Sequence, residues 1–135
     1  MPAPTDRPAA WPFLLLDAVL VVAFAAIGRA SHAESLAPLE VLATAGPFLG
    51  ALLLGWLIVR LIGSNHAAVW PAGVLIWAVT VSSGLALRIL FGDTAAVAFI
   101  IVATLTLAVF LLVPRLVWQL IRRFRARTPA ANTPQ

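Results

Sequence analysis

The sequence predicts an all-α protein, an antiparallel up-down four-helix transmembrane bundle with both termini in the cytoplasm. Of its 135 residues, 62% are hydrophobic and only 10% are charged. A soluble domain averages about a quarter charged residues, so this composition is typical of a membrane protein. Uncharged runs cover residues 41–59, 61–87 and 94–114. Each reaches about the 20 residues that a helix needs to cross a hydrocarbon core of ~30 Å.

These runs, together with an apolar first segment, define the expected domain organisation. The break Gly63-Ser64-Asn65-His66 interrupts the second run, so its helix should start near residue 68. Residues 1–10 form a predicted disordered tail, and residues 122–135 form a basic and then disordered tail. The transmembrane domain between them covers residues 11–121. Its four spans are expected at about residues 11–31, 40–60, 68–91 and 94–118.

The first span contains an acid, Asp17, within its apolar run. Ten strongly apolar residues between Phe13 and Ile27 each favour insertion by about 0.3–0.6 kcal/mol. An acid at the helix centre costs about 2.5–3.5 kcal/mol, so the sum favours a membrane span. A cleaved signal peptide is the alternative, since Ser31-His32-Ala33 resembles a small-x-small cleavage site. Asp17 and the nearby Arg29 argue against that alternative.

The placement of arginine predicts the orientation in the cell membrane. The chain has nine basic residues, and all of them are arginine. If both termini are cytoplasmic, only Arg29 and Arg88 lie on the outer side, and the other seven lie inside. This asymmetry follows the positive-inside rule. The sequence therefore predicts a multi-pass protein of the cell membrane with both termini in the cytoplasm.

Asp17 is the principal candidate site. Counting ~1.5 Å of rise per residue places Trp77 at about the depth of Asp17, and Thr80 lies one turn further along the same helix. A carboxylate inside a membrane must find a partner or take up a proton. One hypothesis makes Asp17 the coupling group of a proton- or cation-driven transporter. The other makes it a structural group bonded to Trp77, Thr80, Arg60 or Arg115.

A second candidate is an outer-edge charge cluster of Arg29, His32, Arg88 and Asp93, with Glu34 beside it. A Zn²⁺ or anion site is conceivable there, but the metal-binding spacings of paired histidines are missing. A solvated rim of mutually neutralised charges is the simpler interpretation.

A basic segment directly follows the last span and contains Arg122, Arg123, Arg125 and Arg127. Such segments attract anionic lipid headgroups at about 1 kcal/mol per residue. The same residues also serve as a topology signal, which is sufficient to explain them. We therefore expect the lipid bilayer and its anionic headgroups to be partners of the chain.

Several function classes are disfavoured by what the sequence lacks. It contains no cysteine, and it has no phosphate-binding glycine loop and no nucleophile elbow. We therefore expect no catalytic site, no metal and no cofactor. The net charge of +4 sits at span ends and in the tail, which speaks against a nucleic-acid partner.

Three short motif groups carry a family resemblance. They are Asp17 with Phe24-Ala25-x-x-Gly28-Arg29-x-x-His32, then Thr44-Ala45-Gly46-Pro47-Phe48 with Gly55-Trp56, and Thr80-Val81 with Gly84 and Leu87-Arg88. Over about residues 13–118 the chain resembles an uncharacterised family of small four-helix prokaryotic membrane proteins, domain of unknown function 3054. The resemblance implies four spans and no known activity. Size and the acid in the first helix are also similar to small multidrug-resistance transporters, but the tyrosines of that family are absent here.

Two functional hypotheses remain open. The first is a non-enzymatic accessory or structural component of the membrane. The second is a small dimeric transporter that uses Asp17 for proton or cation coupling. One bundle of four helices is thin for a translocation pathway, so the second hypothesis requires a homodimer. Under the first, the partner is a second copy or another membrane protein.

Overall fold

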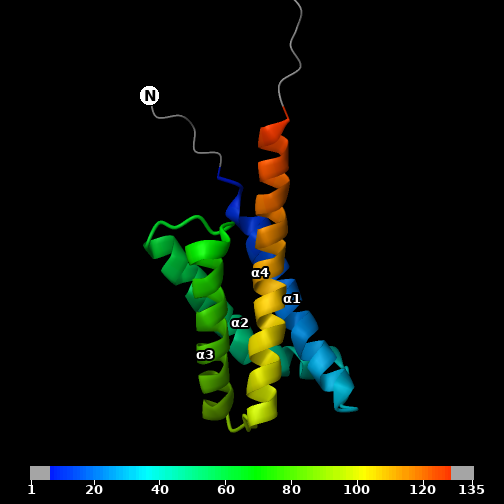
Figure 1. The fold of residues 1–135 in the computed structure, drawn as a ribbon. Helices are drawn as coiled ribbons and strands as arrows, with labels where there is room; N and C mark the ends of the chain where they lie inside the picture. The colour runs from blue at the N-terminus through cyan, green and yellow to red at the C-terminus, as the bar shows by residue number, and fades with distance from the viewer. Residues whose placement is uncertain (1–6, 129–135) are drawn as a thin grey trace, which may run out of the picture.

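The computed structural model describes residues 7–128, and this part of the chain is helical without β-strands. Four long helices occur in this range: α1 (Ala10–Ser31), α2 (Pro38–Leu61), α3 (Val74–Leu90) and α4 (Val97–Arg127). A short wide turn, η1 (Val69–Gly73), leads into α3. Successive helices run in opposite directions (Figure 1). We call the end where α1 starts and α4 finishes the terminal end, and the opposite end, with the α1–α2 and α3–α4 connections, the hairpin end.

The predicted four-helix transmembrane architecture is confirmed for the described residues. The four candidate spans are Ala10–Ser31, Pro38–Leu61, Val69–Leu90, in which η1 and α3 form one span, and Val97–Arg127. Helix α4 begins at Val97 and continues to Arg127, so the basic residues 122–127 are helical. Leucine, arginine and alanine are strong helix formers, and they carry the helix past the apolar run. The remainder of the predicted disordered tails falls mainly on residues 1–6 and 129–135, which lie outside the described residues.

The connections after α1, α2 and α3 begin with the same backbone conformation. The chain enters the left-handed region at Ala33 (φ 55°), Gly63 (φ 70°) and Gly92 (φ 93°). In each case this residue and the next donate N–H bonds of 2.9 to 3.2 Å back to the last turn, which is the Schellman arrangement. The N–H of Asp93, the residue after Gly92, completes this arrangement after α3. The residue that precedes α4 is Ala96.

The helices pack around an aromatic and aliphatic core that includes Phe24, Phe48 and Leu107. Phe48 lies against Gly84 so closely that a side chain there would overlap the ring. Small residues at such positions let helices approach in lipid, where no hydrophobic force drives them together. In each span only 17% to 39% of the most apolar stretch is buried inside the molecule. The remaining apolar surface requires hydrocarbon around it, so the chain is a multi-pass membrane protein.

Candidate functional site

Asp17 is buried in the bundle, with its side chain 1% exposed, and it forms an ion pair with the fully buried Arg115. The Arg115 Nη1 atom donates to Oδ1 at 2.9 Å, and Nη2 donates to Oδ2 at 2.7 Å. This is the two-pronged geometry in which a guanidinium matches a carboxylate, and its hydrogen bonds are stronger than those between neutral groups. The pair joins α1 to α4 across 98 residues of sequence.

Further hydrogen bonds hold both members of this ion pair. The Trp56 indole Nε1 of α2 donates to Asp17 Oδ2 at 2.9 Å. Arg115 Nε donates to the His66 carbonyl at 2.9 Å, and its Nη1 donates to the Leu111 carbonyl at 2.8 Å. The Asp17 carboxylate therefore accepts three N–H bonds, two from Arg115 and one from Trp56. The backbone carbonyls of His66 and Leu111 accept two further N–H bonds from the Arg115 guanidinium. Such satisfaction is what makes a buried charge pair tolerable.

Aromatic rings surround the guanidinium. Its carbon lies 5.9 Å from the centre of the Phe13 ring and 5.8 Å from that of Trp56. The His66 ring stacks on Trp56 with 5.4 Å between centroids. On another side, a Cβ added to Gly73 would lie 2.9 Å from Arg115 Cδ, so only glycine leaves room for this side chain. The ion pair is thus held in a closed, closely packed contact.

In the structure, neither Trp77 nor Thr80, the two residues grouped with Asp17 in the predicted site, binds Asp17. Trp77 turns to α4 and donates to the Thr104 carbonyl at 3.0 Å. Thr80 is buried, but its hydroxyl has no hydrogen-bond partner among the described residues. Of the partners considered from the sequence, Arg115 is the one that binds Asp17, while Arg60 is exposed. Depth along the helices placed Trp77 near Asp17, but depth does not fix the direction in which a side chain points.

Trp56 is the site residue that sequence reasoning missed. Counting ~1.5 Å of rise per residue along α2 places Leu54 and Gly55 at about the depth of Asp17, and this is the signal that could have found Trp56. The His66 carbonyl belongs to the connection between α2 and α3. No residue pattern predicts the direction of a loop carbonyl.

The charge cluster predicted at the outer edge lies at the hairpin end, and the structure divides it in two. Arg29 is engaged through every nitrogen. Its Nε donates to the Ser35 carbonyl at 2.7 Å, its Nη1 to the Thr44 hydroxyl at 2.9 Å, and its Nη2 to Glu40 at 2.9 Å. Glu34 lies 3.3 Å from the same guanidinium. Arg29 therefore ties α1 to α2 and to their connection.

Arg88 is held much more loosely. Its Nε donates to the Thr94 carbonyl at 2.9 Å, and Asp93 lies 3.9 Å from Nη1. The guanidinium carbon lies 4.5 Å from the centre of the Phe99 ring. His32, the remaining predicted member, is exposed at the end of α1.

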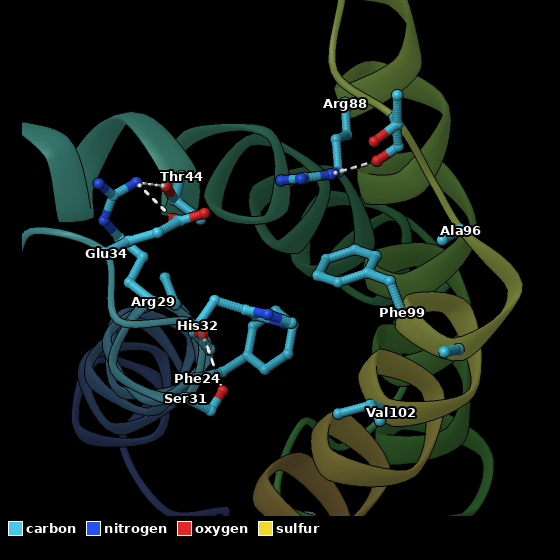
Figure 2. Close-up of a pocket in the computed structure, with 14 residues that line it drawn as sticks. Phe24, Arg29, Ser31, His32, Glu34, Thr44, Arg88, Ala96, Phe99 and Val102 are labelled. Carbon is cyan, nitrogen blue, oxygen red and sulfur yellow. Dashed lines mark hydrogen bonds and ion pairs between the residues drawn. The ribbon is translucent and has the colours of Figure 1, made fainter.

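A cavity of about 460 Å³ lies between these two arginines, and its wall includes residues of all four helices. Figure 2 shows Arg29 and His32 on one side of it and Arg88 and Phe99 on the other. Asp17 does not line this cavity, nor a smaller one of about 240 Å³ at the terminal end.

The basic segment forms the exposed end of α4 (Figure 1). At ~1.5 Å per residue a helix of this length extends well beyond a ~30 Å hydrocarbon layer. Two of its arginines, Arg122 and Arg123, line the smaller cavity beside Trp118. The remaining members of the predicted basic tail, Arg125 and Arg127, lie further along the same helix.

Comparison with known proteins adds one finding to this geometry. Residues 9–118 match the family described as "Protein of unknown function (DUF3054)". The chain belongs to this family. The match covers all four spans of the DUF3054 chain apart from the basic end of α4. No curated protein and no solved structure shows significant similarity to it.

In both regions described above for this DUF3054 chain, the charged groups are mainly arginines and carboxylates. Among residues 7–128, no three histidine, aspartate or glutamate side chains gather in a way that could hold a metal ion. In the buried Asp17–Arg115 pair the two charges neutralise each other, and both carboxylate oxygens already accept hydrogen bonds. The hairpin end instead has a cavity with a charged edge. These two regions therefore suit different roles.

Proposed function

We propose that the protein is a non-enzymatic accessory or structural component of the cell membrane, in which the Asp17–Arg115 pair locks the bundle together. The supporting observation is the saturation of Asp17 by Arg115 and Trp56 in a contact that excludes water. Removing one member of such a pair strands a buried charge. Its role under this proposal is to fix how α1, α2 and α4 pack.

A coupling role for Asp17 is the weaker proposal. A coupling carboxylate must exchange a proton or cation with water on each side of the membrane in turn. Asp17 instead faces a guanidinium at 2.7 Å, which already neutralises it, and lines neither of the two cavities. Opening this contact would separate two charges in a low-dielectric interior, at considerable cost.

We further propose that the terminal end faces the cytoplasm. The terminal end carries the start of α1, the end of α2 and the basic end of α4, whereas Arg29 and Arg88 lie at the hairpin end. This distribution supports a positive-inside orientation. In that orientation the basic end of α4 meets the anionic headgroups of the inner leaflet, its proposed lipid partners.

The substitution Asp17→Asn tests the structural role. It should lower the midpoint of thermal unfolding in detergent by well over 5 °C, because Arg115 would keep its charge without a counter-charge. Proteoliposomes of the wild-type protein should show no solute uptake driven by a pH gradient. Asp93→Asn is the matched control, and it should leave the midpoint unchanged since Asp93 is exposed. A stable Asp17→Asn variant that loses an uptake present in the wild type would establish coupling instead.

The orientation can be tested with single cysteines, because the chain has none of its own. A membrane-impermeant maleimide should label Ser35→Cys, at the hairpin end, in intact cells. Ser64→Cys, at the terminal end, should be labelled only after lysis. The reverse pattern would refute the proposed orientation.

A further inference from the structure

The cavity at the hairpin end has the size and the wall of a ligand site. Its volume of about 460 Å³ falls within the ~300–1,000 Å³ of typical ligand pockets. It lies between α1 and α4, and its wall is largely apolar, with Phe24, Phe99 and Val102 below a charged edge (Figure 2). A molecule bound here would therefore need an apolar part and a polar part.

The charged edge has one cation with hydrogen-bonding capacity to spare. Arg88 uses its Nε on the Thr94 carbonyl, and within residues 7–128 its two terminal nitrogens have no acceptor within hydrogen-bond distance. Its guanidinium reaches over Phe99 toward the space between α1 and α4 (Figure 2). Two adjacent guanidinium nitrogens with free N–H groups match the oxygens of a phosphate or carboxylate.

The opposite edge does not compete for such a ligand. Glu34 lines the cavity, but its carboxylate already pairs with Arg29 at 3.3 Å. Arg29 in turn has its nitrogens engaged by Ser35, Thr44 and Glu40, so it forms a fixed wall without a free donor group for such a ligand. Arg88 is therefore the group on which an anionic headgroup would bind.

The apolar part of the cavity has unfilled space on the α1 side. Gly28 lines the cavity, and a Cβ added there would meet nothing within 4 Å. An acyl chain entering from the surrounding bilayer could lie along this glycine and Phe24. A Cβ at position 28 would enter the same space without a clash, and a longer side chain would fill more of it.

We propose that this cavity binds an anionic lipid of the surrounding bilayer, with the headgroup on Arg88 and one acyl chain between α1 and α4. This ligand site is independent of the proposed structural role of Asp17, since the two regions share no residue.

Native mass spectrometry of the purified full chain in non-ionic detergent can test the site. The probes are oleoyl lysophosphatidylglycerol and, with the same chain, zwitterionic oleoyl lysophosphatidylcholine. The wild type should bind the anionic lipid about tenfold more tightly. Arg88→Gln should remove that preference, and Gly28→Leu should weaken binding of both lipids. Unchanged binding in both variants, each shown to be folded by its thermal unfolding, would refute the proposal.

Matched controls separate this site from other sources of binding. Gly46→Leu adds the same bulk at an exposed position that does not line this cavity, and it should bind lipid like the wild type. Arg125→Gln removes a charge from the basic end of α4. Loss of the headgroup preference in Arg125→Gln but not in Arg88→Gln would place the lipid at that end and overturn the proposal. Inorganic phosphate alone should not displace the lipid, and efficient displacement would mean that the site takes a free anion.

Discussion

The two ends of the bundle use the same residue types in opposite ways. Near the terminal end, Arg115 is 0% exposed and faces a carboxylate that is 1% exposed. At the hairpin end, the side chains of Arg29 and Arg88 are 16% and 19% exposed, and their acidic partners are more than half exposed. Burial decides the difference, because water screens the outer pairs and is excluded from the inner one.

The surroundings explain why only one arginine is enclosed. Arg115 lies within α4, where neighbouring helices supply a tryptophan, an aromatic wall and a glycine notch. Arg29 and Arg88 lie in the last turns of α1 and α3, beside connections that reverse the chain. Helix ends place polar backbone groups near solvent, so the outer arginines bind loop carbonyls. The same openness leaves room for the cavity between them.

The largest effect is expected from Arg115→Gln. It leaves the Asp17 charge buried without its counter-charge, which typically costs about 3–5 kcal/mol. The free energy of unfolding, measured by denaturing detergent in mixed micelles, should fall by that amount. Arg60→Gln is the matched control at an exposed position of the terminal end. It should change stability by less than about 0.5 kcal/mol.

The double variant Asp17→Leu with Arg115→Met tests whether the two buried charges contribute to stability as one unit. An apolar pair of similar volume in place of a buried ion pair is often neutral or stabilising. The double variant should therefore be clearly more stable than Arg115→Gln, although the Trp56 indole loses its acceptor. Losses that simply add would contradict the view that the two charges act as one unit.

A smaller effect is expected from Gly73→Ala. The added methyl group would lie 2.9 Å from Arg115 Cδ and 3.1 Å from the Ala68 carbonyl. Arg115 cannot move aside without breaking the bonds that hold it, so the cost should be about 1–3 kcal/mol. Gly46→Ala, where the space is open, should instead stabilise α2 by up to about 1 kcal/mol. Equal effects of the two substitutions would show that the packing against Arg115 is not critical.

The sequence was sufficient for the architecture because lipid allows few solutions. A spanning segment must satisfy its own backbone, so long apolar runs have to be helices. The buried pair was harder to predict. The depth of Asp17 in the membrane could be predicted from the sequence. Predicting that Arg115, rather than Trp77, is its partner requires knowledge of the rotation of each helix about its axis. The cavity at the hairpin end depends on where loops place Arg88 and Thr94, and no spacing in the sequence encodes this.

Arg29→Gln should have a small effect despite the many bonds of Arg29. Its acidic partners Glu34 and Glu40 remain solvated when the cation is removed, so the free energy of unfolding should fall by about 1 kcal/mol or less. Raising the salt concentration should weaken this contribution and leave that of Arg115 largely unchanged. A loss as large as that of Arg115→Gln would remove the distinction between the two ends.

The smallest effect concerns the backbone beside Arg29. Ala33 holds a left-handed conformation (φ 55°), whereas the equivalent residue after α2 is Gly63 (φ 70°). Left-handed backbone costs a residue with a Cβ about 1–2 kcal/mol, while glycine loses more freedom on folding. Ala33→Gly should therefore stabilise the protein by a few tenths of a kcal/mol to about 1 kcal/mol. Gly63→Ala should do the reverse, and a neutral result there would show that the turn after α2 relaxes without cost.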